Sequence, residues 1–131
     1  MKKELDSIIL TRQELEIMKV VWSRGFATVR EVRDVIAQQK PTAYTTILTL
    51  MNILETKGVL AHRREGRAYV YQPLMTRDQA VQNQLRDVVE RFFAGDSERL
   101  VSSLVDKGCL SSDQLSRLRG LFDDRLQSPA A

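Results

Sequence analysis

The residues with the clearest chemical potential are threonines that recur along one predicted helix, residues 42–57. At about 100° per residue, Thr45, Thr49 and Asn52 fall on one face of that helix. A face that only meets water usually carries charged residues or Gln, because threonine is a mediocre helix former. Short hydroxyl side chains can instead bond base edges and phosphates. The pattern favours a DNA-reading face that comprises Thr42, Tyr44, Thr45, Thr46, Thr49 and Asn52.

The threonines alone fit two interpretations equally well: a DNA-reading face, or side chains that only tolerate a buried helix or cap local turns. The basic segment that follows this helix favours the DNA-reading face. Leu60–Arg63 and Arg67–Gln72 are predicted to form two short strands joined by a tight turn at residues 64–66. Such a hairpin would bring basic side chains to phosphates or a minor groove, although a solvated charged turn is the alternative. The predicted phosphate contacts are Lys57, His62, Arg63, Arg64 and Arg67.

Two shorter helices precede the threonine-rich one and would support it. Thr11 with Glu14, and Thr28 with Glu31, have the spacing of capping boxes, which open helices. Between these helices, residues 26–27 are expected to add one edge to a small sheet. The apolar residues expected to face the core are Leu15, Met18, Val21 and Trp22, then Val29, Val32, Val35 and Ile36, then Ala43, Ile47, Leu50, Met51 and Leu54.

The remaining residues predict three amphipathic helices with too little core to stand alone. The first begins at Thr76, and the others follow Gly95 and Leu110. Fewer than 60 residues rarely bury enough apolar surface, so a second copy is expected to complete the core, rather than packing back onto the first domain as a monomer. The predicted dimer contacts are Val81, Leu85, Val88, Val89, Phe92, Leu100, Leu104, Leu115, Leu118 and Phe122.

The fold class that follows is mainly α with a small β-hairpin wing: a winged helix-turn-helix domain followed by a C-terminal helical dimerisation region. We expect the DNA-binding domain at residues 1–74, the dimerisation region at 75–127 and a flexible tail at 128–131. The charge distribution agrees, because residues 1–74 contain 12 Lys and Arg against 8 Asp and Glu, whereas residues 75–131 contain 8 against 9.

This sequence lacks the residues and motifs that an enzyme active site requires. There is one histidine and one cysteine, Cys109, and the chain shows neither a glycine-rich phosphate loop nor metal-ligand spacing. We therefore predict no catalytic residues, no metal and no cofactor. No apolar run is long enough to cross a bilayer, and the single cysteine fits a reducing compartment, so the sequence favours a cytoplasmic protein without membrane insertion.

Several sequence fragments, taken in their order along the chain, resemble the penicillinase-repressor (BlaI/MecI/CopY) family. The first spans Leu10–Met18 with Trp22, the second includes Ala43–Thr46 and Thr49. The third group comprises Leu54, Lys57, Gly58, Gly66, Arg67, Tyr71 and Pro73. Each fragment alone is weak, but their order and spacing over residues 10–74, followed by a helical tail of suitable size, make a chance similarity improbable.

The resemblance implies a transcriptional repressor that binds an inverted-repeat operator in double-stranded DNA as a homodimer, with the third helix in the major groove. It also implies derepression through a membrane-bound sensor protease, which triggers cleavage near Ser103 and Leu104, although the family's Asn-Phe pair is absent there. Copper control through paired cysteines is excluded by the single Cys109. The alternative function is a winged-helix adaptor that binds proteins and does not bind DNA specifically.

Overall fold

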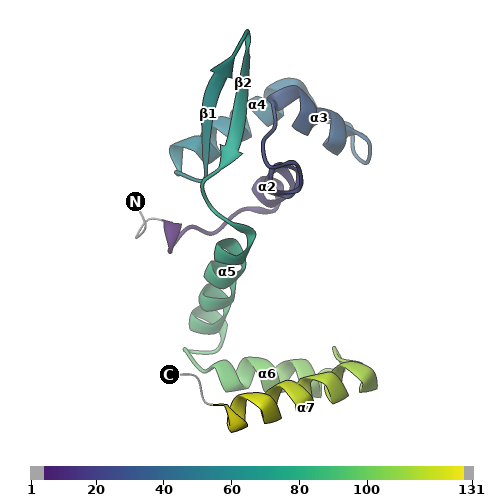
Figure 1. The fold of residues 1–131 in the computed structure, drawn as a ribbon. Helices are drawn as coiled ribbons and strands as arrows, with labels where there is room; N and C mark the ends of the chain where they lie inside the picture. Colours follow the sequence, from purple (N-terminus) through teal and green to yellow (C-terminus); the bar gives the residue numbers. More distant parts are fainter. Residues whose placement is uncertain (1–4, 129–131) are drawn as a thin grey trace. The chain divides into compact units, whose positions relative to one another are not determined.

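The structure, a computed structural model, describes residues 5–128 and is mainly helical with one antiparallel hairpin, as the sequence predicted (Figure 1). Residues 129–131 of the predicted tail lie outside the described residues. The chain divides into two compact units, one ending at Arg86 and the other beginning at Asp87. The elements in order are α2 (Arg12–Arg24), α3 (Val29–Ala37), α4 (Tyr44–Thr56), β1 (Leu60–Glu65), β2 (Ala68–Pro73), α5 (Arg77–Phe92), α6 (Ser97–Asp106) and α7 (Ser112–Gln127).

Helices α2 and α3 begin where their capping boxes predicted. The Thr11 hydroxyl oxygen accepts from the Glu14 amide at 3.1 Å, while the Glu14 carboxylate accepts from the Thr11 amide at 2.9 Å. Thr28 and Glu31 repeat the same pair of bonds at 2.9 and 3.1 Å. Each box satisfies two amides that a helix start leaves without partners, so the local sequence alone determines where these helices begin.

Helix α4 begins at Tyr44 rather than Thr42, which corrects the predicted apolar stripe. Ala43 was expected to be buried on that stripe, but it is the exposed N-cap residue with an extended backbone. The preceding loop is held away from helical geometry, because the Thr42 hydroxyl donates to the Lys40 carbonyl at 2.7 Å. Arg33 in α3 also donates to the Thr42 carbonyl, at 3.1 Å.

The core of the first unit lies where α2, α3 and α4 meet the base of the hairpin. Val35, predicted to face inward, is instead 39% exposed near the end of α3. Trp22 is partly buried at the core edge, where its indole NH donates to the Met75 carbonyl at 2.8 Å. The fully buried side chains include Ile17, Met18 and Val21 of α2, Val32 of α3, Met51 and Leu54 of α4, and Val59 and Met75.

The hairpin is longer and its turn is tighter than predicted. Glu65 pairs with Ala68, so the turn consists only of Gly66 and Arg67, and Gly66 has a φ of 63°. Glycine adopts this left-handed conformation without steric cost, as the first position of a two-residue hairpin loop often requires. As predicted, a third segment joins this sheet, because Ala27 and Tyr71 exchange backbone hydrogen bonds of 2.8 and 2.9 Å.

The first unit continues past residue 74, the predicted end of the DNA-binding domain, into the first half of α5. Asn83 is 4% exposed, and its amide donates to the carbonyls of Ile8, at 3.0 Å, and Leu5. Arg86 also donates to the Asp6 carbonyl at 3.0 Å. These bonds attach the segment before α2 to α5.

The second unit contains the end of α5 together with α6 and α7. Neither α6 nor α7 contains a buried residue, although both carry large apolar side chains.

Within residues 5–128, every helix is too short or too polar to span a membrane.

Candidate nucleic-acid interface

Helix α4 presents a solvent-exposed face that is uncharged and rich in hydroxyl groups. Thr45, Thr49 and Asn52 are exposed on this face, whereas Ile47, Met51 and Leu54 are buried on the opposite one. The flanking residues Tyr44 and Thr46 are also exposed. The structure therefore brings together all of the predicted base-reading residues except Thr42, which precedes the helix.

The N-terminal end of α4 is open to an anion. Ala43 has no side-chain acceptor, and the first turn of α4 contains no acidic residue, in contrast to the boxes that cap α2 and α3. The free amides and the positive end of the helix dipole would both stabilise a phosphate at this position. Arg33, which sequence reasoning missed, lies here through its bond to the Thr42 carbonyl. The sequence pattern did not identify Arg33, because its contact is with the carbonyl of a loop residue nine positions later, beyond the end of α3.

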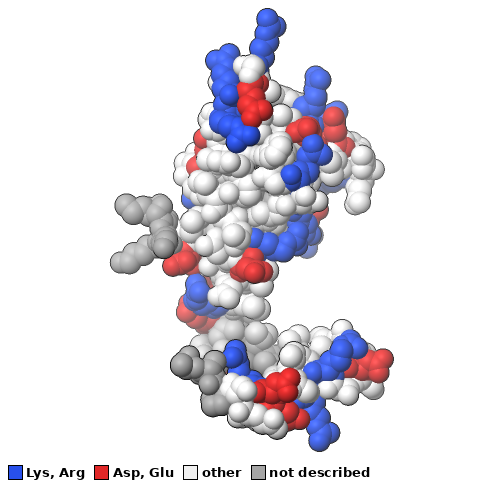
Figure 2. Space-filling model, viewed as in Figure 1, with Lys and Arg blue, Asp and Glu red and all other residues white. Residues whose placement is uncertain are grey.

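Basic side chains gather on the hairpin, which is hereafter called the wing (residues 60–73), with an acidic one among them (Figure 2). Arg63 lies on β1, as predicted. Arg64 also lies on β1 rather than in the turn, and Arg67 lies in the turn rather than at the start of the second strand. The Arg63 Nε atom bonds Glu65 at 2.7 Å, and its guanidinium lies 5.9 Å from the Phe26 ring centroid. All three arginines are exposed and available to phosphate oxygens.

His62 connects the wing to α4. Its Nδ1 atom lies 2.7 Å from the Glu55 carboxylate, and its ring centroid lies 4.7 Å from that of Tyr69. Burial, followed by the charge of Glu55, raises the pKa of Tyr71, so the Tyr71 hydroxyl remains protonated. That hydroxyl lies 3.5 Å from the Asn52 side-chain oxygen. The predicted contact of His62 with phosphate stays a prediction, but in this structure the ring already has partners within the protein.

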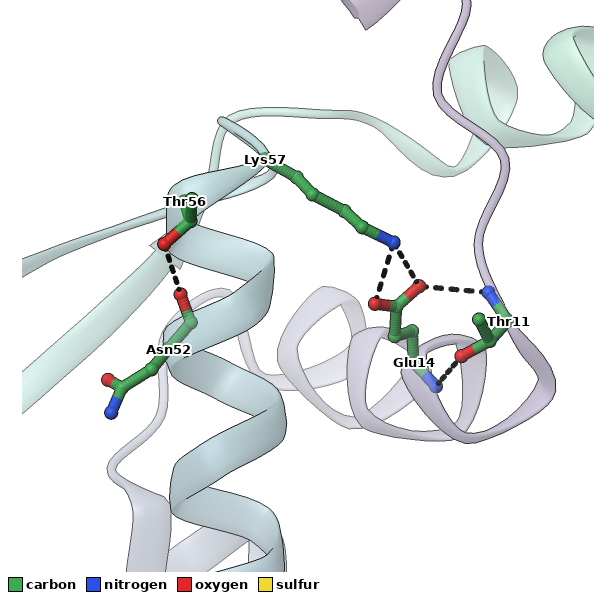
Figure 3. A network of polar contacts seen from close by, with 5 residues as sticks. All are labelled: Thr11, Glu14, Asn52, Thr56 and Lys57. Atoms are coloured by element: carbon green, nitrogen blue, oxygen red, sulfur yellow. Dashed lines mark hydrogen bonds and ion pairs between the residues drawn. The ribbon is translucent and has the colours of Figure 1, made fainter.

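Lys57 lies at the C-terminal end of α4 and reaches toward α2 (Figure 3). Its ammonium donates to both oxygens of Glu14, at 2.8 and 2.9 Å. Glu14 is 2% exposed, while the Lys57 side chain is 34% exposed. Lys57 was predicted from sequence to bind phosphate, but its charge is here engaged by a buried carboxylate that lies 43 positions earlier in the chain.

A three-helix core, an exposed third helix and a two-stranded wing define a winged helix-turn-helix protein. The sequence profile described as "Penicillinase repressor" matches residues 10–124. The chain therefore belongs to the penicillinase repressor family. This is a family of transcriptional repressors, which are not enzymes, so the classification as a regulator rather than an enzyme is confirmed.

Several named proteins are similar to this chain. The penicillinase repressor of Bacillus licheniformis is 27% identical over 111 residues, which cover 85% of this chain and 87% of the relative. The transcriptional regulator BlaI of Mycobacterium tuberculosis is 32% identical over 93 residues, or 70% of this chain and 66% of the relative. A solution structure of monomeric Bacillus licheniformis BlaI with the blaP half-operator is 32% identical, covers 56% of this chain and 89% of that chain, and has a TM-score of 0.49.

Proposed function

We propose that this protein represses transcription by binding a specific DNA operator as a homodimer. The observation that carries the proposal is the exposed hydroxyl face of α4, with its open N-terminal end, beside an arginine-rich wing in a member of a repressor family. Helix α4 would enter the major groove, where Thr45 and Thr49 read base edges. The wing would contact phosphates and supply affinity that does not depend on sequence. Because such a repressor acts on the chromosome, we place it in the cytoplasm.

The proposed dimer is supported by apolar surface that one chain leaves in solvent. Leu85 is 51% exposed, Phe92 71% and Phe122 54%. Patches of large apolar side chains are typical of surfaces that bind another protein. Two linked winged units would bind the two halves of an inverted repeat, and linking two weak contacts raises the overall affinity strongly. The complete set of proposed dimer contacts remains the one predicted from the sequence.

We propose that relief of repression by proteolysis requires α6 to unfold locally first. The Ser103–Leu104 bond lies inside α6, where Leu104 is 40% exposed. Because proteases act on locally opened backbone, a sensor protease would have to reach this bond when α6 unwinds. Cleavage here would separate α7 from the rest of the chain and weaken the dimer.

The direct test is selection of bound sequences from a random pool of DNA duplexes by the full-length protein. The proposal predicts enrichment of an inverted repeat that binds two chains per duplex, as measured by fluorescence anisotropy at low and physiological salt. A matched duplex with the same base composition in scrambled order is the control. If no sequence is enriched over the scrambled duplex, the repressor function is wrong and the adaptor function gains support.

A further inference from the structure

The contact between Lys57 and Glu14 joins the end of α4 to the beginning of α2. Glu14 is the third residue of α2, and its carboxylate already accepts the Thr11 amide. Lys57 is the C-cap residue of α4 and adds two hydrogen bonds to the same carboxylate (Figure 3). The carboxylate is thus the common partner of one helix start and one helix end. We call these three residues, Thr11, Glu14 and Lys57, the α2–α4 clamp.

The backbone of Lys57 is itself fixed by the way α4 ends. The amide of Val59 donates to the Leu54 carbonyl at 2.9 Å, and that of Gly58 donates to the Glu55 carbonyl at 3.0 Å. These two bonds form a Schellman motif, with Gly58 in the left-handed conformation at a φ of 85°. The Lys57 side chain therefore projects from a defined position, and its ion pair attaches the C-terminal end of α4 to the start of α2.

The electrostatics of the clamp favour a permanent ion pair. Burial by itself pushes the pKa of Glu14 upward, but the hydrogen bonds from Lys57 and Thr11 and the charge of Lys57 outweigh burial and lower the pKa. The carboxylate is charged at neutral pH and needs a cation, since a buried charge without a partner is strongly unfavourable. An ammonium drawn away to a phosphate would leave Glu14 in that state.

We infer that Lys57 and Glu14 are positioning residues, which set the orientation of α4 for DNA reading and do not themselves contact DNA. The inference rests on the proposed DNA binding and names residues that determine its specificity. Figure 3 shows the Lys57 side chain extending to α2, while the Asn52 amide lies on the other side of α4. The side chains of Asn52 and Lys57 thus project in different directions from the same helix.

The test uses the full-length protein, the duplex selected by the wild type and its scrambled version, with anisotropy measured across a series of salt concentrations. Glu14→Gln distinguishes the two roles of Lys57 by sign. If Lys57 is a positioning residue, Glu14→Gln weakens binding to the selected duplex by roughly tenfold, about the effect of one lost base contact, and leaves scrambled binding unchanged. If Lys57 binds phosphate, Glu14→Gln frees its ammonium and tightens binding to both duplexes.

Three further variants complete the experiment. Lys57→Met should weaken binding to the selected duplex without changing the slope of log affinity against log salt, and Lys57→Arg should restore affinity because it retains a cation for Glu14. Lys19→Met is the matched control, since Lys19 is an exposed lysine on α2 that pairs with Glu16 at 3.0 Å. All variants are assayed well below their unfolding temperatures, so loss of folded protein cannot mimic a loss of specificity.

Two results would overturn the inference while the repressor function stands. One is a salt slope that falls by about one per chain in Lys57→Met, which is the signature of a lost phosphate contact. The other is tighter binding, or unchanged binding, by Glu14→Gln. Failure of the wild type to select any duplex would instead overturn both proposals.

Discussion

Removing the cation from the α2–α4 clamp should destabilise the first unit more than neutralising the anion. Lys57→Met leaves the Glu14 carboxylate, which is 2% exposed, without a charged partner. Breaking a fully buried ion pair costs roughly 3–5 kcal/mol, and because the Lys57 side chain is 34% exposed we reduce the expected loss to about 2–3 kcal/mol. Glu14→Gln keeps the capping box and leaves Lys57 able to reach water, so we expect a smaller loss of about 1–2 kcal/mol.

The assay is urea unfolding of the full-length protein, followed by tryptophan fluorescence. Trp22 is the only tryptophan in the sequence, and its indole donates to the Met75 carbonyl within the first unit. The signal therefore reports the unit that contains the clamp, including the start of α5, because the Arg77 guanidinium lies 5.3 Å from the centroid of the Trp22 ring. Lys57→Met with the stability of the wild type, or a larger loss in Glu14→Gln than in Lys57→Met, would show that the pair contributes less than its geometry indicates.

Further predictions concern DNA affinity, the oligomeric state and the pH dependence of stability. Thr49→Ala should weaken binding to the selected duplex by about fivefold more than to scrambled DNA, and equal losses in anisotropy would contradict base reading. Arg64→Ala should weaken both and reduce the salt slope by about one per chain. Leu118→Asp should yield monomers in light scattering, and an intact dimer would remove that face from the interface. Because the pKa of Glu14 is lowered on folding, its contribution is present above pH about 4.5 and lost below it; the stability difference between wild type and Glu14→Gln should shrink in urea unfolding as the solution is acidified.

The parts of this structure that could be predicted from sequence are those determined by neighbouring residues. The capping boxes at Thr11 and Thr28 each depend on a partner three positions away, so the starts of α2 and α3 were readable directly. The start of α4 was not, because Ala43 remains outside the helix partly through the bond from Arg33 to the preceding loop. Secondary structure that depends on another element leaves no periodic signal in its own segment.

In the candidate site, too, features set by neighbouring residues were predictable and contacts with distant residues were not. Helical spacing correctly placed Thr45 and Thr49 on the exposed face of α4, since the opposite face is visibly apolar. The ion pair of Lys57 with Glu14 could not be read from the sequence because the two residues lie 43 positions apart, and the predicted phosphate contact of Lys57 stays a prediction. The first unit likewise extends past residue 74 through bonds between Asn83 and the N-terminal segment, which join residues more than 70 positions apart.

The position of β1 in the sheet has a consequence for handling the protein. Strand β2 pairs with β1 on one side and with Ala27 on the other, so the outer edge of β1 has no strand partner among residues 5–128. Open strand edges can template aggregation, and charged side chains along them oppose it. Arg63 and Arg64 lie on this edge strand, so the side chains proposed to bind phosphate also keep the strand from pairing with another copy. Replacing both with alanine would make the protein aggregate more readily, whereas replacing them with glutamate would remove these two proposed phosphate contacts and keep the edge protected.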